Sequence, residues 1–120
     1  MVDDMAINRQ IATRLLEKLG FAVESAENGQ AAVDTLTEKG ADYYDAVLMD
    51  IQMPVMDGYE ATRAIRQKSE MYFKCIPIIA VTANASDEDA QKATLAGMNG
   101  HISKPISPVE LADTLETQLK

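Results

Sequence analysis

The stretch AVLMDIQMPVMDG, from Ala46 to Gly58, decides the fold. It starts as an apolar segment of strand length, reaches a carboxylate at Asp50, and continues through a Pro-containing loop to Gly58, where a helix can start. In parallel sheets, functional groups collect at the carboxyl ends of the strands. The role of Asp50 therefore depends on what lies at the ends of the neighbouring strands.

The rest of the chain alternates between patterns typical of strands and of helices. The segment 76–81, IPIIAV, is nearly all apolar and β-branched, as expected for a strand covered on both faces. Short strands are also predicted over 21–25, 45–50 and 101–103, and helices over 7–19, 28–40, from 57 onward, 86–96 and 107–119. Repeated strand–helix units predict one α/β domain over residues 1–120, with a parallel sheet between two layers of helices.

Local signals mark the helices in more detail. The first helix has one apolar stripe, and the last has a stripe expected to be buried: Ile7, Ile11, Leu15 and Leu19, then Leu111, Leu115 and Leu119. Residues that can cap helix N-termini stand at Asn28, Asp57, Ser86 and Ser107. The polar connection 67–74 carries no clear pattern.

The first strand is unusually short. Only Met1 and Val2 precede Asp3, although the first strand of such a sheet is usually central. A full strand would bury about four more apolar side chains, at roughly 1.5–3 kcal/mol each, against a domain stability of about 5–15 kcal/mol. Three explanations stay open. The start of the natural chain is missing from this sequence, the domain is stable with a shortened first strand, or a neighbouring molecule supplies a strand.

Composition excludes several classes of protein. The formal net charge of −8 argues against binding of a nucleic-acid backbone. No apolar run approaches the roughly 20 residues that span a bilayer, and no signal-peptide pattern opens the chain. A lone cysteine, Cys75, cannot form an internal disulfide and is interpreted as an inert packing or surface residue. We expect a soluble, cytoplasmic domain without contact to a membrane.

Polar side chains follow the predicted strands at their carboxyl ends. They are Asp3 and Asp4, then Asp50, Thr82 and Lys104. Since parallel strands end at one edge of the sheet, three carboxylates, a hydroxyl and an ammonium are expected to meet there. Carboxylates within about 5 Å repel by about 3 kcal/mol per pair at an effective dielectric constant near 20, so the cluster must protonate in part or hold a cation. Oxygen ligands of this kind favour Mg²⁺.

A magnesium site at this edge predicts phosphate chemistry. A lysine can neutralise one phosphoryl oxygen, and a hydroxyl can donate a hydrogen bond to another. An aspartate in line with the cluster can itself be the nucleophile and form an acyl phosphate. No general base is needed, because a carboxylate is already deprotonated at neutral pH.

These motifs together resemble the receiver domain of the two-component response-regulator family. The matching stretches are VDD at Val2–Asp4, LMDIQMPVMDG at Leu48–Gly58, VTANA at Val81–Ala85 and SKP at Ser103–Pro105, with AENG at Ala26–Gly29 and AGMNGHISKPI at Ala96–Ile106. The resemblance covers essentially the whole chain. The segment MDIQMPVMDG and the residue Asn8 most resemble the corresponding positions of receivers attached to hybrid sensor histidine kinases.

The resemblance implies a fold and a role for each site residue. The fold is a flavodoxin-like, doubly wound five-stranded parallel sheet in the order 2-1-3-4-5, here with an apparently truncated first strand. Asp50 would be the phosphoacceptor, and Mg²⁺ would contact Asp4 directly, Asp3 largely through water, and the Gln52 backbone carbonyl. Lys104 would pair with the phosphoryl group, and Thr82 would be the switch hydroxyl.

Two further features come from the same comparison. The family usually has Tyr or Phe three residues before the lysine, whereas this chain has His101, so an aromatic rotamer switch is altered here. His101 is expected near the switch surface. The Lys104–Pro105 bond is cis in similar domains. Asp57, by contrast, is interpreted as a helix cap only.

The leading functional hypothesis is a phosphorylation-dependent switch in a phosphorelay. The donor would be a phosphohistidine on a sensor histidine kinase or a histidine phosphotransfer domain that docks near the first helix, and a phosphorylation-dependent dimer is a further expectation. We expect no enzymatic turnover beyond self-phosphotransfer and slow autodephosphorylation. The alternatives are a Mg²⁺-dependent phosphatase with an aspartyl nucleophile, a degenerate receiver that acts as a constitutive interaction module, and a flavin-binding domain.

Overall fold

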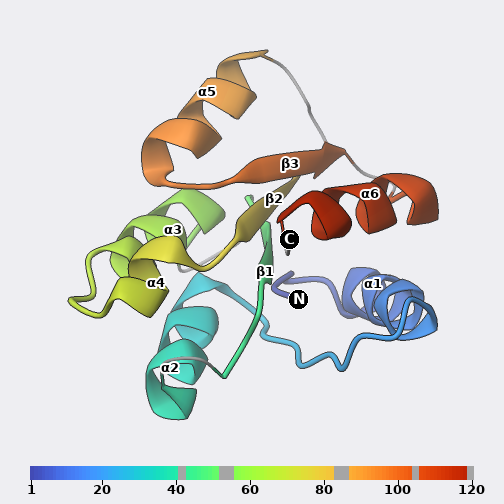
Figure 1. The fold of residues 1–120 in the computed structure, drawn as a ribbon, viewed down its shortest axis with the longest axis horizontal. Helices are drawn as coiled ribbons and strands as arrows, with labels where there is room; N and C mark the ends of the chain where they lie inside the picture. Colours follow the sequence, from blue (N-terminus) through green and yellow to red (C-terminus); the bar gives the residue numbers. More distant parts are fainter. Residues whose placement is uncertain (41–42, 52–55, 83–86, 104–105, 119–120) are drawn as a thin grey trace.

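The protein is described by a computed structural model that covers residues 1–40, 43–51, 56–82, 87–103 and 106–118. Two layers of helices enclose a parallel sheet (Figure 1). The elements are α1 (Ala6–Lys18), α2 (Gly29–Lys39), β1 (Val47–Asp50), α3 (Gly58–Arg66), α4 (Met71–Cys75), β2 (Ile78–Thr82), α5 (Asp87–Ala96), β3 (Gly100–Ser103) and α6 (Pro108–Gln118). The predicted cap Ser86, the Lys104–Pro105 bond and Leu119 lie outside the described residues.

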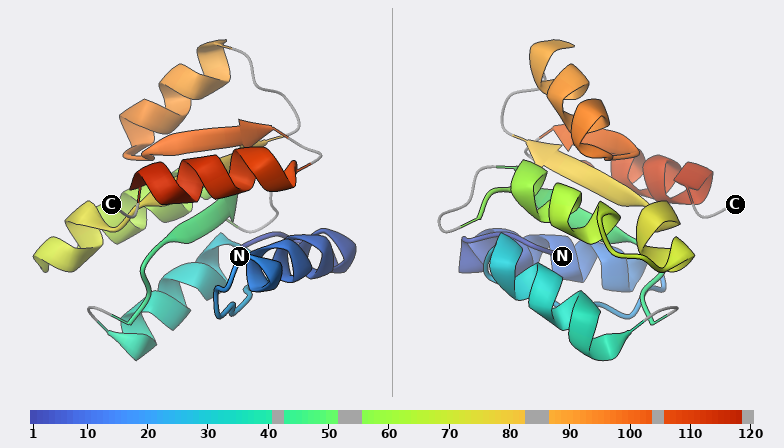
Figure 2. Two further views of the ribbon diagram at one scale, coloured as in Figure 1. Left: turned by 45° about the vertical axis from the view of Figure 1, so that its right-hand side comes forward. Right: turned by 90° about the vertical axis from the view of Figure 1, so that its left-hand side faces the viewer.

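The three described strands form a parallel sheet in the order β1-β2-β3. Every residue of β1 and β2 is buried, as the apolar composition of these segments predicts for strands covered on both faces. The core lies in two layers. Helices α2, α3, α4 and α5 pack on one face of the sheet, and α1 and α6 pack on the other (Figure 2).

The first strand of the predicted sheet is reduced to one bridging residue. Val2 pairs in parallel with Met49 on one side and with Ala26 on the other. The Val2 amide donates to Leu48 O at 2.7 Å, and the Asp50 amide donates to Val2 O at 2.9 Å. The lateral order of the segments, with Ala26 beside Val2, then β1, β2 and β3, is therefore consistent with the expected order 2-1-3-4-5.

The predicted strand over 21–25 does not form. In the described residues this segment runs beside Met1 without a strand, and only Ala26, one residue further on, makes a bridge. The reason is that its intended neighbour is so short: a segment can pair along its length only where a second strand accompanies it.

Local signals predicted most helix boundaries correctly. The Asn28 side chain accepts a hydrogen bond from the Ala31 amide at 2.8 Å and caps α2. Asp57 accepts from the Glu60 amide at 2.8 Å and caps α3, which confirms its structural role. Gly20 follows α1 with a positive φ of 96°, a conformation that favours glycine.

The structure decides two features of the helices that the sequence pattern left open. The connection 67–74 contains the helix α4, which has no apolar period because it is only five residues long, yet it buries Phe73. The stripe on α1 is exposed at Ile7 (60%) and Ile11 (50%), whereas Leu15 packs partly against the core and the fully buried positions are Ala12 and Leu16. The face of α1 that carries Ala12 and Leu16 is therefore the one that packs on the core.

Arg66, at the end of α3, ties three parts of the fold together. Its guanidinium donates to Gly97 O at 3.0 Å, to Phe73 O at 3.0 Å and to Asn99 Oδ1 at 2.8 Å. Burial lowers the pKa of this group, and the charge of Cys75 acts in the opposite direction. The three hydrogen bonds hold α4 and the turn before β3 against α3.

Substitution of Arg66 should therefore destabilise the domain. We expect Arg66→Gln to lower the free energy of unfolding by about 2–3 kcal/mol, because hydrogen bonds from a charged group contribute about 1.5–3 kcal/mol each and do not add fully. Urea denaturation measures the loss. Arg63→Gln, on the exposed face of the same helix, is the matched control and should stay within about 0.5 kcal/mol of the parent. Equal values for the two variants would contradict the role of Arg66.

Candidate functional site

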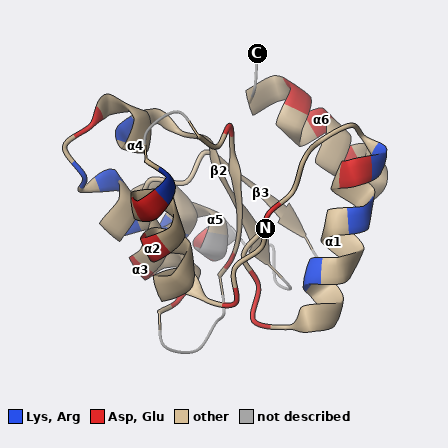
Figure 3. Ribbon diagram, turned by 90° about the horizontal axis from the view of Figure 1, so that it is seen from below, with Lys and Arg blue, Asp and Glu red and all other residues tan. Residues whose placement is uncertain are grey.

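The candidate site lies at the carboxyl ends of the central strands. Asp50 is the last residue of β1, Asp3 directly follows the bridging residue Val2, and Thr82 ends β2. Figure 3 shows acidic positions on loops between the two layers of helices, as well as on the helices themselves. The site is thus built from segments that are 32 residues apart or more and that meet because the strands are parallel neighbours.

Three carboxylates form the centre of the site. Asp3, Asp4 and Asp50 each offer an oxygen, and these oxygens all lie within 4.8 Å of one another. Asp3 is fully buried, Asp50 is 3% exposed, and Asp4 is exposed. Two buried carboxylates beside a third carry a large repulsive energy that a divalent cation would remove. The all-oxygen donor set, open on one side at Asp4, fits a hard ion such as Mg²⁺ that keeps several water ligands.

The backbone around the acids is held firmly. Asp3 Oδ1 accepts a hydrogen bond from the Met5 amide at 2.9 Å, which orients the carboxylate at the start of α1. On the β1 side, the Ile51 amide donates to Val81 O at 3.2 Å, and the Gly58 amide donates to Ile51 O at 2.9 Å. The start of α3 at Gly58 is therefore held beside the end of β1.

Arg9 is a site neighbour that the sequence analysis missed. Its Nη1 donates to the carbonyl oxygen of Asp3 at 2.7 Å. The arginine reaches back across the first turn of α1 and places a positive charge beside the acidic cluster. A spacing of six residues does not predict such a contact, because the contact depends on how the chain turns between Asp3 and α1.

The remaining predicted residues have different outcomes. Thr82 is 7% exposed and stands opposite Ser103 in the register of β2 and β3. His101 is exposed on β3, opposite Ala80. Lys104 and Gln52 lie outside the described residues, so their predicted roles remain predictions. Among the described residues, no helix is long and apolar enough to cross a membrane.

Comparison with known proteins gives the family. The family model of the response regulator receiver domain matches residues 1–116. The chain is 39% identical over 117 residues to hybrid signal transduction histidine kinase L of Dictyostelium discoideum, covering 97% of this chain and 7% of that protein. It is 39% identical over 115 residues to sensor protein GacS of Pseudomonas syringae pv. syringae, covering 95% of this chain and 12% of that protein. The chain thus spans about a tenth of the length of these relatives.

Solved structures agree with this assignment. The receiver domain of sensor histidine kinase PA1611 from Pseudomonas aeruginosa PAO1, which has a magnesium ion coordinated in its active site cleft, superposes with a TM-score of 0.86 at 38% identity and covers 98% of this chain and 93% of that chain. Chemotaxis protein CheY4 of Vibrio cholerae superposes with a TM-score of 0.88 at 34% identity, covering 98% of this chain and 94% of that one. The chain, with its parallel sheet and its acidic cluster at the strand ends, belongs to the receiver domains of the response-regulator family that act in two-component phosphorelays.

Proposed function

We propose that Asp50 is the phosphoacceptor of this receiver domain and that Asp3, Asp4 and Asp50 hold Mg²⁺. The observation that carries the proposal is the approach of the three carboxylates to within 4.8 Å of one another. Bound Mg²⁺ would neutralise the carboxylates and the oxygens of an incoming phosphoryl group. Gln52 and Lys104 complete the proposed site by their match to the family motif.

The chemistry at Asp50 is a phosphoryl transfer from phosphohistidine. A carboxylate oxygen of Asp50 attacks phosphorus, and an O–P bond forms while the P–N bond to the donor imidazole breaks. The electron pair of the broken bond stays on the imidazole nitrogen, which takes up a proton. Arg9, by its bond to Asp3 O, keeps the acidic segment in place during this step.

The same geometry supports a switch through Thr82 and His101. Ala80 and Thr82 alternate with Val81 along β2, and Ala80 packs in the core layer of α2, α3, α4 and α5. His101, opposite Ala80, is therefore on the same face of the sheet as Thr82. Phosphorylation of Asp50 draws the Thr82 hydroxyl toward the phosphoryl group and changes the burial of His101 beside α5.

The donor is a sensor histidine kinase or a histidine phosphotransfer domain. On α1, Ile7 is 60% exposed and Ile11 is 50% exposed. These exposed apolar side chains support docking of the donor domain beside the acidic cluster. We propose that the domain works in the cytoplasm and contacts neither nucleic acid nor a membrane. We also propose that it dimerises on phosphorylation. It is not expected to turn over an external substrate. A phosphatase with an aspartyl nucleophile typically carries its general acid shortly after the nucleophile in sequence, but Ile51 and Gln52 follow Asp50 here.

Intact-mass analysis tests the proposal. We expect exposure to a small-molecule phosphodonor to add one phosphoryl group to the protein in the presence of Mg²⁺ and essentially none when Mg²⁺ is chelated. No mass gain with Mg²⁺, or an equal gain without it, would overturn the assignment.

Magnesium should also stabilise the fold. At a free Mg²⁺ concentration 100 times the dissociation constant, we expect about 2.7 kcal/mol of added stability, measured as a rise in the thermal midpoint. Asp4→Asn should weaken Mg²⁺ binding about tenfold or more, because it removes one negative charge from the ligand set. Asp4 is exposed, so the substitution should not disturb the packing of the core. The control is Asp113→Asn, an exposed acid on α6, which should respond to Mg²⁺ like the parent.

A further inference from the structure

Arg9 stands at an unfavourable position for a cation in its own helix. It is the fourth residue of α1, close to the amide groups of the first turn, which form the positive end of the helix dipole. The first turn, which lies wholly within the described residues, contains no acidic side chain, and the N-cap residue Met5 makes no side-chain hydrogen bond. The charge of Arg9 is therefore not compensated at this end of its helix.

The compensating charge comes from the acidic cluster. Arg9 is half-buried, and its Nη1 donates to Asp3 O at 2.7 Å. The carbonyl oxygen of an aspartate lies at most about 6 Å from its own carboxylate oxygens, so the guanidinium is within roughly 9 Å of the Asp3 carboxylate. One oxygen of each of the three acids lies within 4.8 Å of the others, and two of the acids are buried. The separation is close to the Debye length of about 8–10 Å, so the guanidinium attracts the cluster through a partly buried region that salt screens poorly.

The hydrogen bond from Arg9 also fixes the course of the chain at Asp3. The Asp3 amide donates to Ala26 O at 3.2 Å, and Asp3 Oδ1 accepts from the Met5 amide at 2.9 Å. The bond from Arg9 to the carbonyl oxygen of Asp3 completes this set. Arg9 thus acts on the cluster in two ways, by its hydrogen bond and by its charge. A neutral donor of similar reach supplies only the first.

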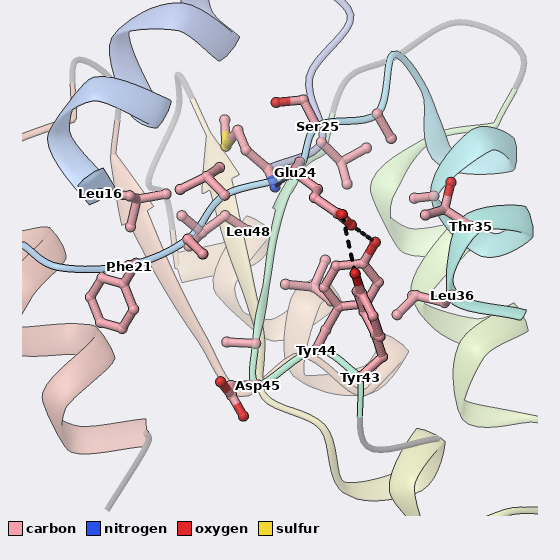
Figure 4. A pocket seen from close by; sticks show the side chains of 18 of the residues that line it. Leu16, Phe21, Glu24, Ser25, Thr35, Leu36, Tyr43, Tyr44, Asp45 and Leu48 are labelled. Atoms are coloured by element: carbon pink, nitrogen blue, oxygen red, sulfur yellow. Dashed lines mark hydrogen bonds between the residues drawn. The ribbon is translucent and has the colours of Figure 1, made fainter. Parts of the chain in front are cut away.

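An acid at the other end of the sheet is held by neutral donors. Glu24 lines a cavity of about 640 Å³ between the segments 20–26 and 43–48 (Figure 4). Its carboxylate accepts hydrogen bonds from the hydroxyl of Tyr44 and, at 3.5 Å, from that of Tyr43. Burial raises the pKa of Tyr44, and the hydrogen bond to Glu24 adds to the shift, so this hydroxyl keeps its proton and donates. Neutral hydroxyls bind this single carboxylate, whereas the three carboxylates at the strand ends lie beside a full positive charge.

We propose that Arg9 is a positioning residue that serves as a fixed counter-charge for the metal-free cluster, and that its charge weakens the binding of Mg²⁺ there. The inference rests on the magnesium site of the proposed function. In the metal-free protein, the guanidinium attracts the carboxylates and keeps the acidic segment in place. A divalent cation among the same oxygens would be repelled by the guanidinium, so part of the attraction that binds the ion is lost. Arg9 thereby stabilises the metal-free domain and favours release of the ion.

Three variants separate the charge of Arg9 from its hydrogen bond. Arg9→Gln removes the charge, and Arg9→Lys keeps it. Arg14→Gln is the matched control, because Arg14 is exposed on the same helix and lies about 7.5 Å further along its axis. Titration calorimetry of the metal-free proteins with magnesium chloride measures the affinity. We expect Arg9→Gln to bind Mg²⁺ about threefold or more tightly than the parent, and the other two variants to stay within about twofold of it.

The metal-free proteins give a second readout. In excess chelator, we expect the thermal midpoint of Arg9→Gln to lie below that of Arg14→Gln, and Arg9→Lys to recover most of the loss. Saturating Mg²⁺ should narrow the gap between the two glutamine variants, because a ligand that binds one folded protein more tightly stabilises that protein more at the same concentration.

Several outcomes would overturn the proposal. Weaker Mg²⁺ binding by Arg9→Gln than by the parent would show that the hydrogen bond to Asp3 O governs the site and that the charge does not. Equal affinities for Arg9→Gln and Arg14→Gln, or an Arg9→Lys variant that behaves like Arg9→Gln, would contradict it as well. Absence of Mg²⁺ binding by the parent would instead overturn the proposed function, and the metal-free midpoints alone would then support or overturn the counter-charge.

Discussion

Asp50→Asn should abolish phosphorylation of the domain. We expect no mass gain from a small phosphodonor in the presence of Mg²⁺, against one phosphoryl group in the parent, because an amide oxygen lacks the negative charge and the nucleophilicity of a carboxylate. The same change removes one of the three carboxylates within 4.8 Å of one another. Relief of repulsion should make the metal-free variant at least as stable as the parent. Phosphorylation is read by intact mass, and stability by thermal denaturation.

The chain offers a close control for this substitution. Asp57 lies seven residues further on, and its carboxylate caps α3 through the Glu60 amide. Asparagine caps a helix about as well as aspartate, so Asp57→Asn should keep both the fold and the phosphorylation of the parent. If Asp57→Asn abolished the mass gain and Asp50→Asn did not, the assignment of the phosphoacceptor would be wrong.

Gly58→Ala should have the largest effect on stability. A Cβ atom at Gly58 would collide with the carbonyl oxygen of Asp50 and lie 2.9 Å from Ile51 Cα. Both are backbone atoms next to the phosphoacceptor, so the start of α3 must move away from the end of β1. We expect a loss of about 3 kcal/mol or more, in the range of other severe substitutions in cores, measured by urea denaturation. Mg²⁺ binding should weaken in the same variant, because the displaced strand end carries Asp50.

Gly100→Ala is the matched control, at a position where the structure has room for a Cβ atom. There the nearest atom to a new Cβ is Ile79 Cδ1 at 3.6 Å, an ordinary van der Waals distance. Gly100 lies in β3, where alanine also costs less backbone entropy than glycine. We expect its free energy of unfolding to stay within about 1 kcal/mol of the parent. A loss as large as that of Gly58→Ala would show that the close approach to Asp50 is not the cause.

Features that depend on neighbours in sequence were predictable. The caps Asn28 and Asp57 each bond an amide three residues ahead, so a short window contains both partners. The strand predicted over 76–81, which the structure has at Ile78–Thr82, is recognisable because both of its faces are apolar. The exposed position of Cys75 agrees with its expected role as a packing or surface residue. The resemblance to receiver domains then named the acids, and the structure brings Asp3, Asp4 and Asp50 together.

Tertiary packing decided the features that the sequence left open or indicated wrongly. The face of α1 that is buried is the one with Ala12 and Leu16, whereas Ile7 and Ile11 are exposed, and the apolar period alone did not distinguish these two faces. The contact of Arg9 with Asp3 O, and the three bonds of Arg66, join the chain across turns whose course no local pattern states.

The sequence by itself thus determined most of the strands and helices, where most helices start, and which residue types follow the strands at one edge of the sheet. Only the tertiary structure decided that Val2 bridges Met49 and Ala26, and which face of α1 is buried. The physical reason is the separation along the chain over which each interaction acts. Capping and periodicity act over three or four residues, whereas ladder hydrogen bonds and side-chain packing join residues that are far apart in the chain.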